Sequence, residues 1–509
     1  MSEPSSADAD PAGAVDRRVF LAGLAGYGLT FAGGAGAAVS LSRRRPRGSR
    51  LIAGLRQAVR GPVIEPGQSG FLAAAHVYNE RFDDVLPLAV ARPLDAADVR
   101  SAVRWAAAHD VPPRARSGGH SYAGYSTLAG GIVLDLRYLS QVGFDRRAGI
   151  ATLGGGAQLI DVYAGLAAHG VTIPAGSCPS VGVAGHALGG GMGLAGRALG
   201  LTTDNLFAAE LATADGRLQR VDRHSDPELL WALRGAGGGN FGVVTELEFH
   251  AHRLPRACAW FSVAWPWASA GDALDAWQHW APHAREQLTS VFHLETGAER
   301  PRVLVAGQYL GPAGELARLL EPLAGAGPAT VRAGDQDYFD LQVRWAGPAC
   351  SAQSLQGCHT VGTRPGGTLP RESFRAKSDY VSRPLSPTGR ELLVAAVAAR
   401  QGQPGSGSIL FDSYGGAINR VAPDATAFVH REALFCIQYL DYGGGPSWLR
   451  GVHAAMRGHV SGMAYQNYID PELGDWQHAY YGANYPRLLA IRRRVDPDHR
   501  FNFPQAIGR

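Results

Sequence analysis

The chain is almost without lysine, although it carries much positive charge. Of its 48 lysine and arginine residues a single one, Lys377, is a lysine. A Walker A phosphate loop requires Gly-Lys-Ser or Gly-Lys-Thr, and Lys377 follows Ala376 instead. The formal net charge is only +4, and no block of basic residues falls inside the folded portion. These absences exclude a P-loop nucleotide site and argue against a nucleic-acid partner.

Cysteine is also scarce. The five cysteines include no CxxC pair, so the sequence describes neither a disulfide framework nor a zinc site. Cys350 and Cys358 are close enough in sequence to form a disulfide. The alternative is that both remain thiols.

What the chain does have is length, ordinary hydrophobicity and much glycine. Its 509 residues are 46% hydrophobic and 18% charged, which predicts two or three packed domains. The 67 glycines concentrate between Ser117 and Gly242 and indicate tight turns and close backbone contacts.

The amino terminus resembles an export segment and is set aside from the fold. Arg17 and Arg18 precede an apolar stretch that runs to about Val39. We expect residues 1–40 to be a twin-arginine signal, which would send the protein to the cell envelope or outside the cell. The alternative is an uncleaved membrane anchor, since about 20 apolar residues can span a bilayer. Membrane contact is expected only through this segment.

The remaining pattern mixes short strands and helices, which predicts an α+β fold. Strands are expected at residues 86–93, 130–139, 302–310, 408–418 and 433–440, and helices at 95–110 and within 150–170. The glycine-rich texture changes near Pro255. We therefore expect a linker and lead-in at 41–78, a first domain at 79–254, a second domain with an antiparallel sheet at 255–455, and a carboxy-terminal segment at 456–509 that returns to the first domain.

Two glycine-dense loops indicate a bound ligand. The run "SGGHSYAGYST" starts at Ser117 and presents His120 at the tip of a loop. The run "PAGSCPSVGVAGHALGGGMG" spans residues 174–193, and its glycines are expected to bring backbone N–H groups close to one phosphate or pyrophosphate. These glycines are residues 176, 182, 185, 189, 190, 191 and 193. A Rossmann fingerprint is not clearly supplied by the context of either run.

These loops and five later motifs resemble one known family. The later motifs are "GLTTDNL", "GGGNFGVVT", "YGGAIN", "YQNYID" and "YYGANYPRL". In this order they are similar to the FAD-linked oxidases related to berberine bridge enzyme, of the vanillyl-alcohol oxidase type. The resemblance runs from about Glu80 to the carboxyl terminus. It implies a two-part FAD-binding domain of the PCMH type and a substrate domain whose antiparallel sheet is covered by helices.

The resemblance also implies how the cofactor is held. FAD would be bonded covalently through His120 and Cys178, because imidazole and thiolate are nucleophiles able to add to an oxidised flavin. Further cofactor contacts are expected from Arg116, Ser117, Gly118, Gly119, Ser121, Gly176, Val181, Gly182, Gly185, His186, Val243 and Asn484. No metal is expected, because His120 and His186 have no third ligand at a suitable spacing.

Oxidation of an alcohol also requires a base for the hydroxyl proton. The resemblance gives this role to Tyr468, with Asp412 and Tyr414 as helpers, and leaves Tyr465 as a rival base. Tyr414 could instead be an ordinary strand tyrosine. Val181, three positions after Cys178, is the residue type found in oxidases, so dioxygen is the expected acceptor and hydrogen peroxide the product.

The substrate class is open between two kinds of alcohol. Met192 stands where some sugar-oxidising relatives have an aromatic residue, so either an oligosaccharide or the hydroxyl of a secondary metabolite fits. Tyr439, Tyr442 and Tyr465 could stack on sugar rings or belong to the core. The alternatives to an oxidase are a flavin-dependent dehydrogenase that uses another acceptor, and a flavin-binding or electron-relay protein without turnover.

Overall fold

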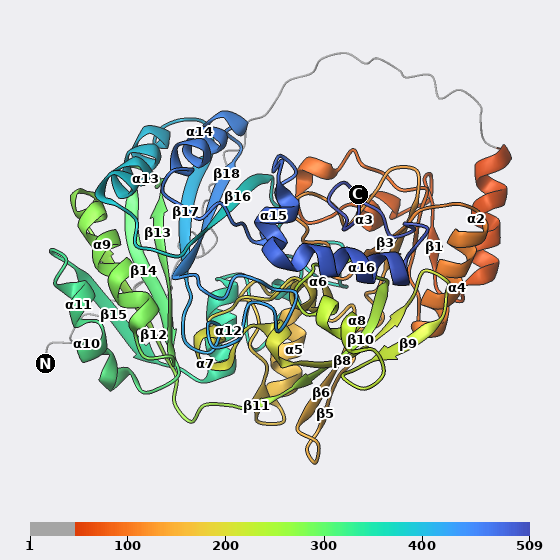
Figure 1. Cartoon of the computed structure of the whole chain (residues 1–509), viewed down its shortest axis with the longest axis horizontal. Helices are drawn as coiled ribbons and strands as arrows, with labels where there is room; N and C mark the ends of the chain where they lie inside the picture. The colour runs from red at the N-terminus through yellow and green to blue at the C-terminus, as the bar shows by residue number, and fades with distance from the viewer. Residues whose placement is uncertain (1–45) are drawn as a thin grey trace, which may run out of the picture.

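The computed structural model describes residues 46–509 (Figure 1). The predicted export signal at residues 1–40 lies outside this range. Within it, no helix is both long and apolar enough to cross a bilayer.

A small, mostly parallel sheet begins the fold. Its strand order is β1 (Val63–Ile64), β2 (Ala89–Ala91), β4 (Ile132–Asp135), β3 (Pro113–Arg116), with only β1 antiparallel. Helix α4 (Ala96–Ala108) connects β2 to β3 as predicted, and the Asp95 carboxylate caps it by accepting from the Asp98 amide. β3 leads directly into the first glycine loop.

The lead-in at residues 46–78 is part of this unit rather than a linker. It contains α2 (Pro46–Ala58) and α3 (Phe71–Ala75). Ile52, Leu55 and Val59 recur at helical spacing and pack in one core cluster with Val99 of α4. The apolar face of α2 therefore packs this segment against the first domain.

An antiparallel five-stranded sheet follows. Its order is β5 (Val142–Asp145), β6 (Ile150–Gly154), β10 (Val243–His250), β8 (Leu206–Ala212), β9 (Leu218–Val221). After β6 the chain turns into α5 (Leu159–Ala167) and ends the helix near Gly170, whose φ is +73°. The second glycine loop continues into α6 (Val183–Leu188) and α7 (Gly196–Leu199), and α8 (Pro227–Leu233) precedes β10. β7 (Val171–Thr172) pairs with β11 (His252–Arg253).

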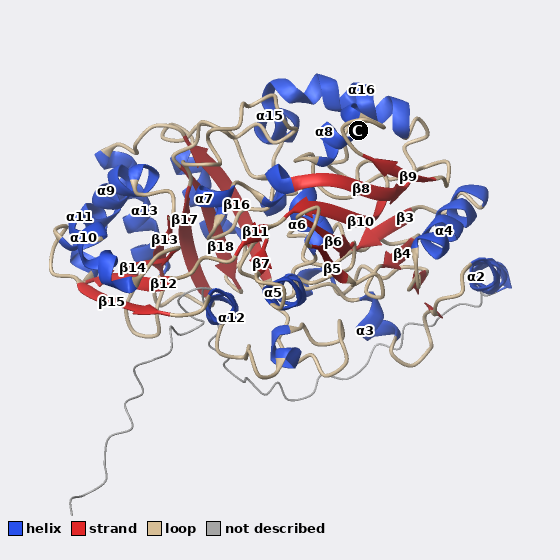
Figure 2. Ribbon diagram, turned by 90° about the horizontal axis from the view of Figure 1, so that it is seen from below, coloured by secondary structure: helices blue, strands red, loops and turns tan. Residues whose placement is uncertain are grey.

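The second half of the chain is built on a seven-stranded antiparallel sheet, as predicted. Its order is β15 (Thr330–Asp335), β12 (Ala259–Trp265), β14 (Arg302–Tyr309), β13 (Leu288–Glu295), β17 (Ser406–Ser413), β18 (Phe435–Tyr442), β16 (Phe374–Val381). The helices of this half are α9 (Ala270–Trp280), α10 (Leu316–Leu319), α11 (Glu321–Ala324), α12 (Tyr338–Ala346), α13 (Pro387–Arg400) and α14 (Pro446–Met456). Figure 2 shows α9, α10, α11 and α13 on the side of this sheet that faces away from the other sheets.

The two faces of the large sheet have different partners, because side chains alternate along a strand. On β17, Ile409 and Phe411 pack in the cluster formed with α9, α13 and α14. Their neighbours Leu410 and Asp412 point to the opposite face and line a cavity. One face of the sheet is therefore structural, and the other faces the glycine loops.

The carboxy-terminal segment packs back on the first half of the chain. Helices α15 (Trp476–Tyr481) and α16 (Tyr485–Val495) lie above the smaller sheets in Figure 2. Arg494 of α16 makes two 2.8 Å hydrogen bonds to the Asp226 carboxylate at the start of α8. The 3-10 helix Gln466–Tyr468 precedes α15 and carries Tyr468 to the cavity. The helices and antiparallel sheets together confirm the predicted α+β class.

Candidate active site

A cavity of about 340 Å³ lies where the two glycine loops meet the inner face of the large sheet. Volumes of this order are typical of cofactor and small-molecule sites. Thirteen predicted site residues line it: Ser117, Gly118, Gly119, His120, Ser121, Gly176, Cys178, Val181, Gly182, Gly185, His186, Asp412 and Tyr468. The fold thus brings together residues separated by more than three hundred positions in sequence.

The two glycine loops touch each other through their backbones. A Cβ on Gly118 would lie 2.2 Å from the Gly182 nitrogen, and a Cβ on Gly182 would lie 2.1 Å from the Ser117 hydroxyl. Because such distances are far below van der Waals contact, both positions require glycine. This contact holds His120 and Cys178 on adjoining loops at one side of the cavity.

His120 is held in place as a neutral imidazole. Its ring stacks on Tyr78, with 4.0 Å between centroids and 21° between planes. Its Nε2 lies 3.0 Å from the Ser180 hydroxyl. Burial lowers the pKa of His120 to about 3, so the ring is unprotonated at neutral pH. A neutral, oriented imidazole in a cavity wall is suited to act as a nucleophile.

The cavity wall beside the second loop has a stretch without side chains, which fits a bulky planar or phosphate-bearing group. A Cβ on Gly185 would have no atom within 4 Å, and a Cβ on Gly238 would meet only the Gly185 Cα, at 3.6 Å. Gly237 and Gly239 complete this stretch and have φ values of +90° and +82°. A cofactor can therefore approach the backbone directly here, as FAD binding requires.

Of the seven predicted glycines of the second loop, Gly189, Gly190 and Gly191 do not line the cavity, and close crossings of protein segments account for several of the seven. A Cβ on Gly193 would collide with the Ala175 carbonyl oxygen at 1.8 Å, and one on Gly189 with the Asn467 amide at 2.0 Å. A Cβ on Gly191 would lie 2.4 Å from the Thr202 hydroxyl. These glycines are needed because protein segments cross closely, a cause that sequence alone does not separate from ligand contact.

His186 has a structural hydrogen bond within the second loop. Its Nε2 accepts from the Gly176 amide at 2.9 Å, and burial lowers its pKa to about 4. The residues described at 46–509 contain no group of three metal-binding side chains placed to hold an ion. The arrangement at His186 thus orders the loop around Cys178.

Tyr468 and Asp412 line the same cavity and are joined by a hydrogen bond. The Tyr468 hydroxyl donates to the Asp412 carboxylate at 3.1 Å. Burial raises the pKa of Asp412 to about 7, and the hydrogen bond from Tyr468 opposes this shift. Burial, followed by the negative charge of Asp412, raises the pKa of Tyr468 well above its usual value. Asp412 can therefore accept a proton near neutral pH, whereas Tyr468 does not hold a negative charge by itself.

Tyr465, the rival base, is engaged differently. Its hydroxyl oxygen accepts hydrogen bonds from the Gly191 amide at 2.9 Å, from the Asn467 side chain at 3.0 Å and from the Met192 amide at 3.3 Å. Burial raises the pKa of Tyr465 to about 12. These donors occupy its oxygen and tie it to the triple-glycine turn, and Tyr468 is the tyrosine with a carboxylate to receive its proton.

Among the cavity residues that were not predicted as site residues, two have aromatic rings that stack on predicted ones. Tyr122 stacks on Tyr468, with 5.4 Å between centroids and 9° between planes, and its hydroxyl accepts from Gln438 of β18 at 2.7 Å. Tyr78 stacks on His120, as described above. Tyr122 stands two residues after His120 in the first glycine loop, so the motif itself contained the signal. Tyr78 precedes the motifs, so the sequence contained no signal for it.

Four predicted site residues do not line this cavity. The Arg116 guanidinium points behind its loop and donates to the carbonyls of Ala74, Ala75, His76 and Ser126. The Asn484 amide donates to the carbonyls of Pro423, Thr426 and Ala427. Val243 is buried in the core that surrounds α4. The backbone or core engages each side chain, which the sequence motif did not reveal.

Tyr414 is the fourth predicted site residue that does not line the cavity. Its hydroxyl lies 3.0 Å from that of Tyr380, and the side chain is fully buried in an aromatic cluster that also contains Tyr465 and packs against Tyr468. Its position directly after β17 and its contact with Tyr380 fit the alternative interpretation, an ordinary tyrosine packed in the sheet. Among the tyrosines considered for sugar stacking, Tyr442 and Tyr465 line the cavity, whereas Tyr439 packs on the helix-covered face of the sheet.

Comparisons with known proteins agree with this geometry. A family model described as FAD binding domain matches residues 87–222, and one described as berberine and berberine like matches residues 464–508. The chain is 33% identical over 439 residues to the uncharacterized FAD-linked oxidoreductase YgaK of Bacillus subtilis, with 84% of this chain and 92% of that protein covered. It is 30% identical to the xylooligosaccharide oxidase of Thermothelomyces thermophilus, with 88% and 92% covered.

A solved structure extends the likeness to three dimensions. Physcomitrella patens BBE-like 1 superposes with a TM-score of 0.82 at 31% identity, over 90% of this chain and 98% of that chain. Fold and site together define an FAD-linked oxidoreductase, and the predicted PCMH-type architecture with a helix-covered antiparallel sheet is confirmed. The chain belongs to the family of berberine bridge enzyme-like FAD oxidases.

Proposed function

We propose that this protein is a bicovalent FAD-dependent oxidase that oxidises an alcohol and reduces dioxygen to hydrogen peroxide. One observation carries the proposal. The hydrogen-bonded pair Tyr468 and Asp412 lines the same cavity as His120 and Cys178. A proton acceptor and two nucleophiles that can attach a flavin therefore share one site. When bound, FAD supplies the acceptor for a hydride from the alcohol carbon.

His120 and Cys178 would hold the cofactor. The neutral imidazole of His120 and the thiol of Cys178 line the cavity from adjoining loops, which supports attachment of one ring system at two points. Cys178 is not disulfide-bonded. The backbone around Gly185 and Gly237–Gly239 leaves room beside them.

Tyr468 would remove the hydroxyl proton of the substrate. Its own proton passes to Asp412 along the 3.1 Å hydrogen bond, so no isolated phenolate has to form. The pKa of Asp412, about 7, suits this transfer at neutral pH. Tyr122 stacks on Tyr468 and keeps its ring oriented.

The cavity supports a polar alcohol as substrate. The buried Thr289 hydroxyl lines it and has no hydrogen-bond partner among the described residues, and Gln438 adds an amide. A polar group that lacks a protein partner in a cavity is suited to bind a hydroxyl-rich ligand. Relatives bear the names chitooligosaccharide oxidase and xylooligosaccharide oxidase, which supports a sugar, while Met192 keeps a secondary-metabolite hydroxyl as the alternative.

Two further parts of the proposal concern the electron acceptor and the location. Val181 lines the cavity beside Cys178 and is small, which supports access of dioxygen. Export by the twin-arginine route, directed by Arg17 and Arg18, agrees with the disulfide between Cys350 and Cys358, because disulfides persist in oxidising compartments.

The test is anaerobic reduction of the purified protein. Acid-precipitated protein should retain its yellow colour and the mass of FAD. Mixed without oxygen with oligosaccharides or with simpler alcohols, the flavin should bleach with its substrate, then recolour in air with formation of hydrogen peroxide. Colour released by acid would overturn the covalent attachment, and bleaching without recolouring in air would make the protein a dehydrogenase.

A further inference from the structure

Behind His120 lies a second cavity that the proposed chemistry does not use. It has a volume of about 260 Å³, and its lining includes Thr360, Thr363 and Arg371 together with the outer side of the first glycine loop. Ser117, Gly118 and Gly119 border both cavities. The first glycine loop is therefore a thin partition between the two spaces.

A chain of hydroxyl groups crosses this partition at His120. The Nε2 of His120 lies 3.0 Å from the Ser180 hydroxyl, and the Thr360 hydroxyl donates to Ser180 at 2.8 Å. Ser180 is fully buried, and Thr360 lines the second cavity. The imidazole is thus linked through two hydroxyl groups to a space on the far side of its loop.

We propose that Ser180 and Thr360 are positioning residues for the covalent attachment of FAD to His120, and that they carry away the Nε2 proton. The inference rests on the proposed attachment. With Nε2 directed to Ser180, Nδ1 is the nitrogen left to form the bond. An imidazole alkylated at Nδ1 that kept its Nε2 proton would be a buried cation. The low pKa of His120, about 3, shows that this environment strongly disfavours a positive charge.

The attachment step balances as follows. A bond forms between Nδ1 of His120 and a ring-methyl carbon of FAD, and one C–H bond of that methyl breaks with loss of a proton. The electron pair of that C–H bond reduces the flavin ring. The Nε2 proton would leave along the two hydroxyls, each taking up one proton as it passes one on, once both have rotated so that Ser180 donates to Thr360, and it would reach solvent in the second cavity. Dioxygen would then reoxidise the ring and become hydrogen peroxide, and the two protons that it takes up balance the methyl proton and the Nε2 proton.

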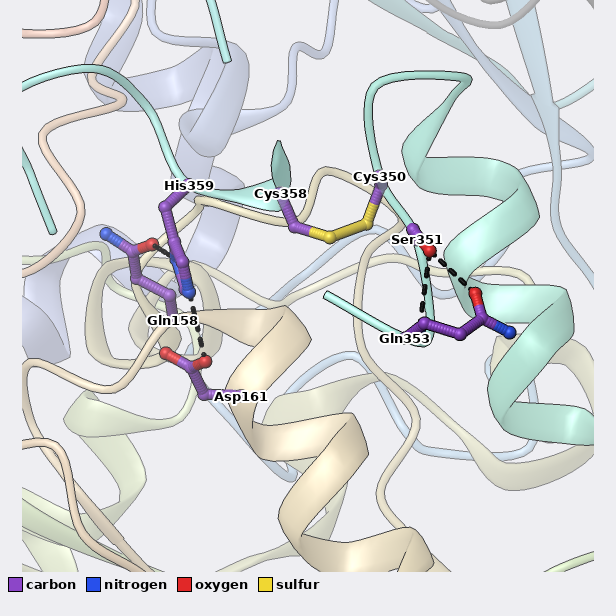
Figure 3. The surroundings of a disulfide bond; sticks show 7 residues. All are labelled: Gln158, Asp161, Cys350, Ser351, Gln353, Cys358 and His359. Atoms are coloured by element: carbon purple, nitrogen blue, oxygen red, sulfur yellow. Dashed lines mark hydrogen bonds and ion pairs between the residues drawn. A yellow bond between two sulfur atoms is a disulfide. The ribbon is translucent and has the colours of Figure 1, made fainter. Parts of the chain in front are cut away.

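A disulfide-closed loop ends two residues before Thr360, and Figure 3 shows this disulfide and the neighbouring His359. Cys358 bridges to Cys350, and the next residue, His359, has its Nδ1 2.6 Å from Gln158 Oε1 and its Nε2 3.3 Å from the Asp161 carboxylate. Both partners of His359 lie at the start of α5. The same end of α5 pairs by backbone with the Cys178 loop, through the amides of residues 159 and 160 and the carbonyls of residues 181 and 179, each at 3.0 Å. The disulfide loop and the Cys178 loop are therefore fixed to one helix end.

The test measures the covalent attachment of FAD from the mass of the denatured chain, and it does not depend on enzymatic turnover. In a Cys178→Ala background, His120 is the single attachment point, and the denatured chain should carry the mass of FAD on the peptide that contains His120. Adding Thr360→Val, which keeps the shape but removes the hydroxyl, should slow this attachment roughly 10²-fold, the size expected for loss of a proton acceptor. Thr360→Ser restores the hydroxyl and should restore the rate. Ser180→Ala should act like Thr360→Val.

The outcomes separate the relay from the attachment. Equal attachment rates in the Val and Ser variants at position 360, with FAD bound and melting temperatures unchanged, would overturn the relay alone. A wild-type chain that carries no covalent FAD would overturn the attachment and the relay together. Slower attachment in the Val variant and recovery in the Ser variant, at unchanged binding of FAD, would establish the hydroxyl function, because a purely structural role does not distinguish valine from serine in this way.

Discussion

The hydroxyl of Tyr468 donates to the carboxylate of Asp412, and these residues come from the carboxy-terminal segment and from β17 of the large sheet. The proposed base is therefore assembled only when the carboxy-terminal segment packs across the two halves of the fold. The two residues have different parts in the proposed base: Tyr468 is too weak an acid to ionise alone, whereas Asp412, with a pKa of about 7, can accept the proton that Tyr468 gives up.

Removal of the Tyr468 hydroxyl should slow flavin reduction without loss of the cofactor. We expect Tyr468→Phe to lower the anaerobic bleaching rate by roughly 10²- to 10⁴-fold, the range for loss of a general base. Stopped-flow absorbance measures this rate. Tyr414→Phe is the matched control, because the Tyr414 hydroxyl pairs with Tyr380 outside the cavity. A loss in Tyr465→Phe that exceeds the loss in Tyr468→Phe would assign the base to Tyr465 instead.

The bleaching rate should depend on the ionisation of Asp412. Below a pH of about 7 the carboxyl is protonated and cannot accept the Tyr468 proton, so the rate should fall as the pH decreases through this value. Asp412→Asn should remove this limb of the pH profile and leave a slow, flat rate. A limb that persists unchanged in Asp412→Asn would show that another group titrates.

Val181 should control the reaction with dioxygen and not the reaction with substrate. Val181→Leu adds a larger side chain to the cavity wall beside Cys178. Reoxidation of the reduced flavin by air should become slower, while anaerobic bleaching by substrate stays near the wild-type rate. Mixing reduced protein with oxygenated buffer in stopped flow measures the first quantity. Unchanged reoxidation would remove Val181 from the dioxygen path.

The single lysine should be a structural support of the catalytic segment. Lys377 is buried on β16 and makes ion pairs with Asp470 at 2.7 Å and with Glu472 at 3.1 Å, two and four residues beyond Tyr468. Lys377→Met leaves the buried Asp470 without its cation and should lower the free energy of unfolding by about 3–5 kcal/mol. Urea titration measures this loss.

Lys377→Arg is the informative partner of that variant. It keeps the charge but replaces a compact ammonium group by a planar fork in a buried space. We expect intermediate stability and slower bleaching, since the Tyr468 segment shifts. Wild-type stability in both variants would show that the ion pair contributes nothing measurable.

Local patterns predicted the elements, and the motifs predicted which loops form the site. The Asp95 cap, the helix that ends near Gly170 and the strands β14, β17 and β18 of the large sheet follow from short-range signals, whereas β12, β13, β15 and β16 were not predicted. The partners of individual polar groups did not follow. Arg116 was expected at the cofactor because of its place in the motif, yet the free carbonyls at the end of α3, forty residues earlier, take its guanidinium. Glycine likewise gives no sign of whether a ligand or another loop is its neighbour.

The backbone contact between Gly118 and Gly182 affects how a protein with this fold can change its substrate. Because the backbones of the two glycine loops are locked to each other, the loops that would hold the cofactor form one frame, while the sheet face opposite can accumulate changes. Changes in β13, β17 and β18 can then alter which substrate binds, while the position of the cofactor stays the same.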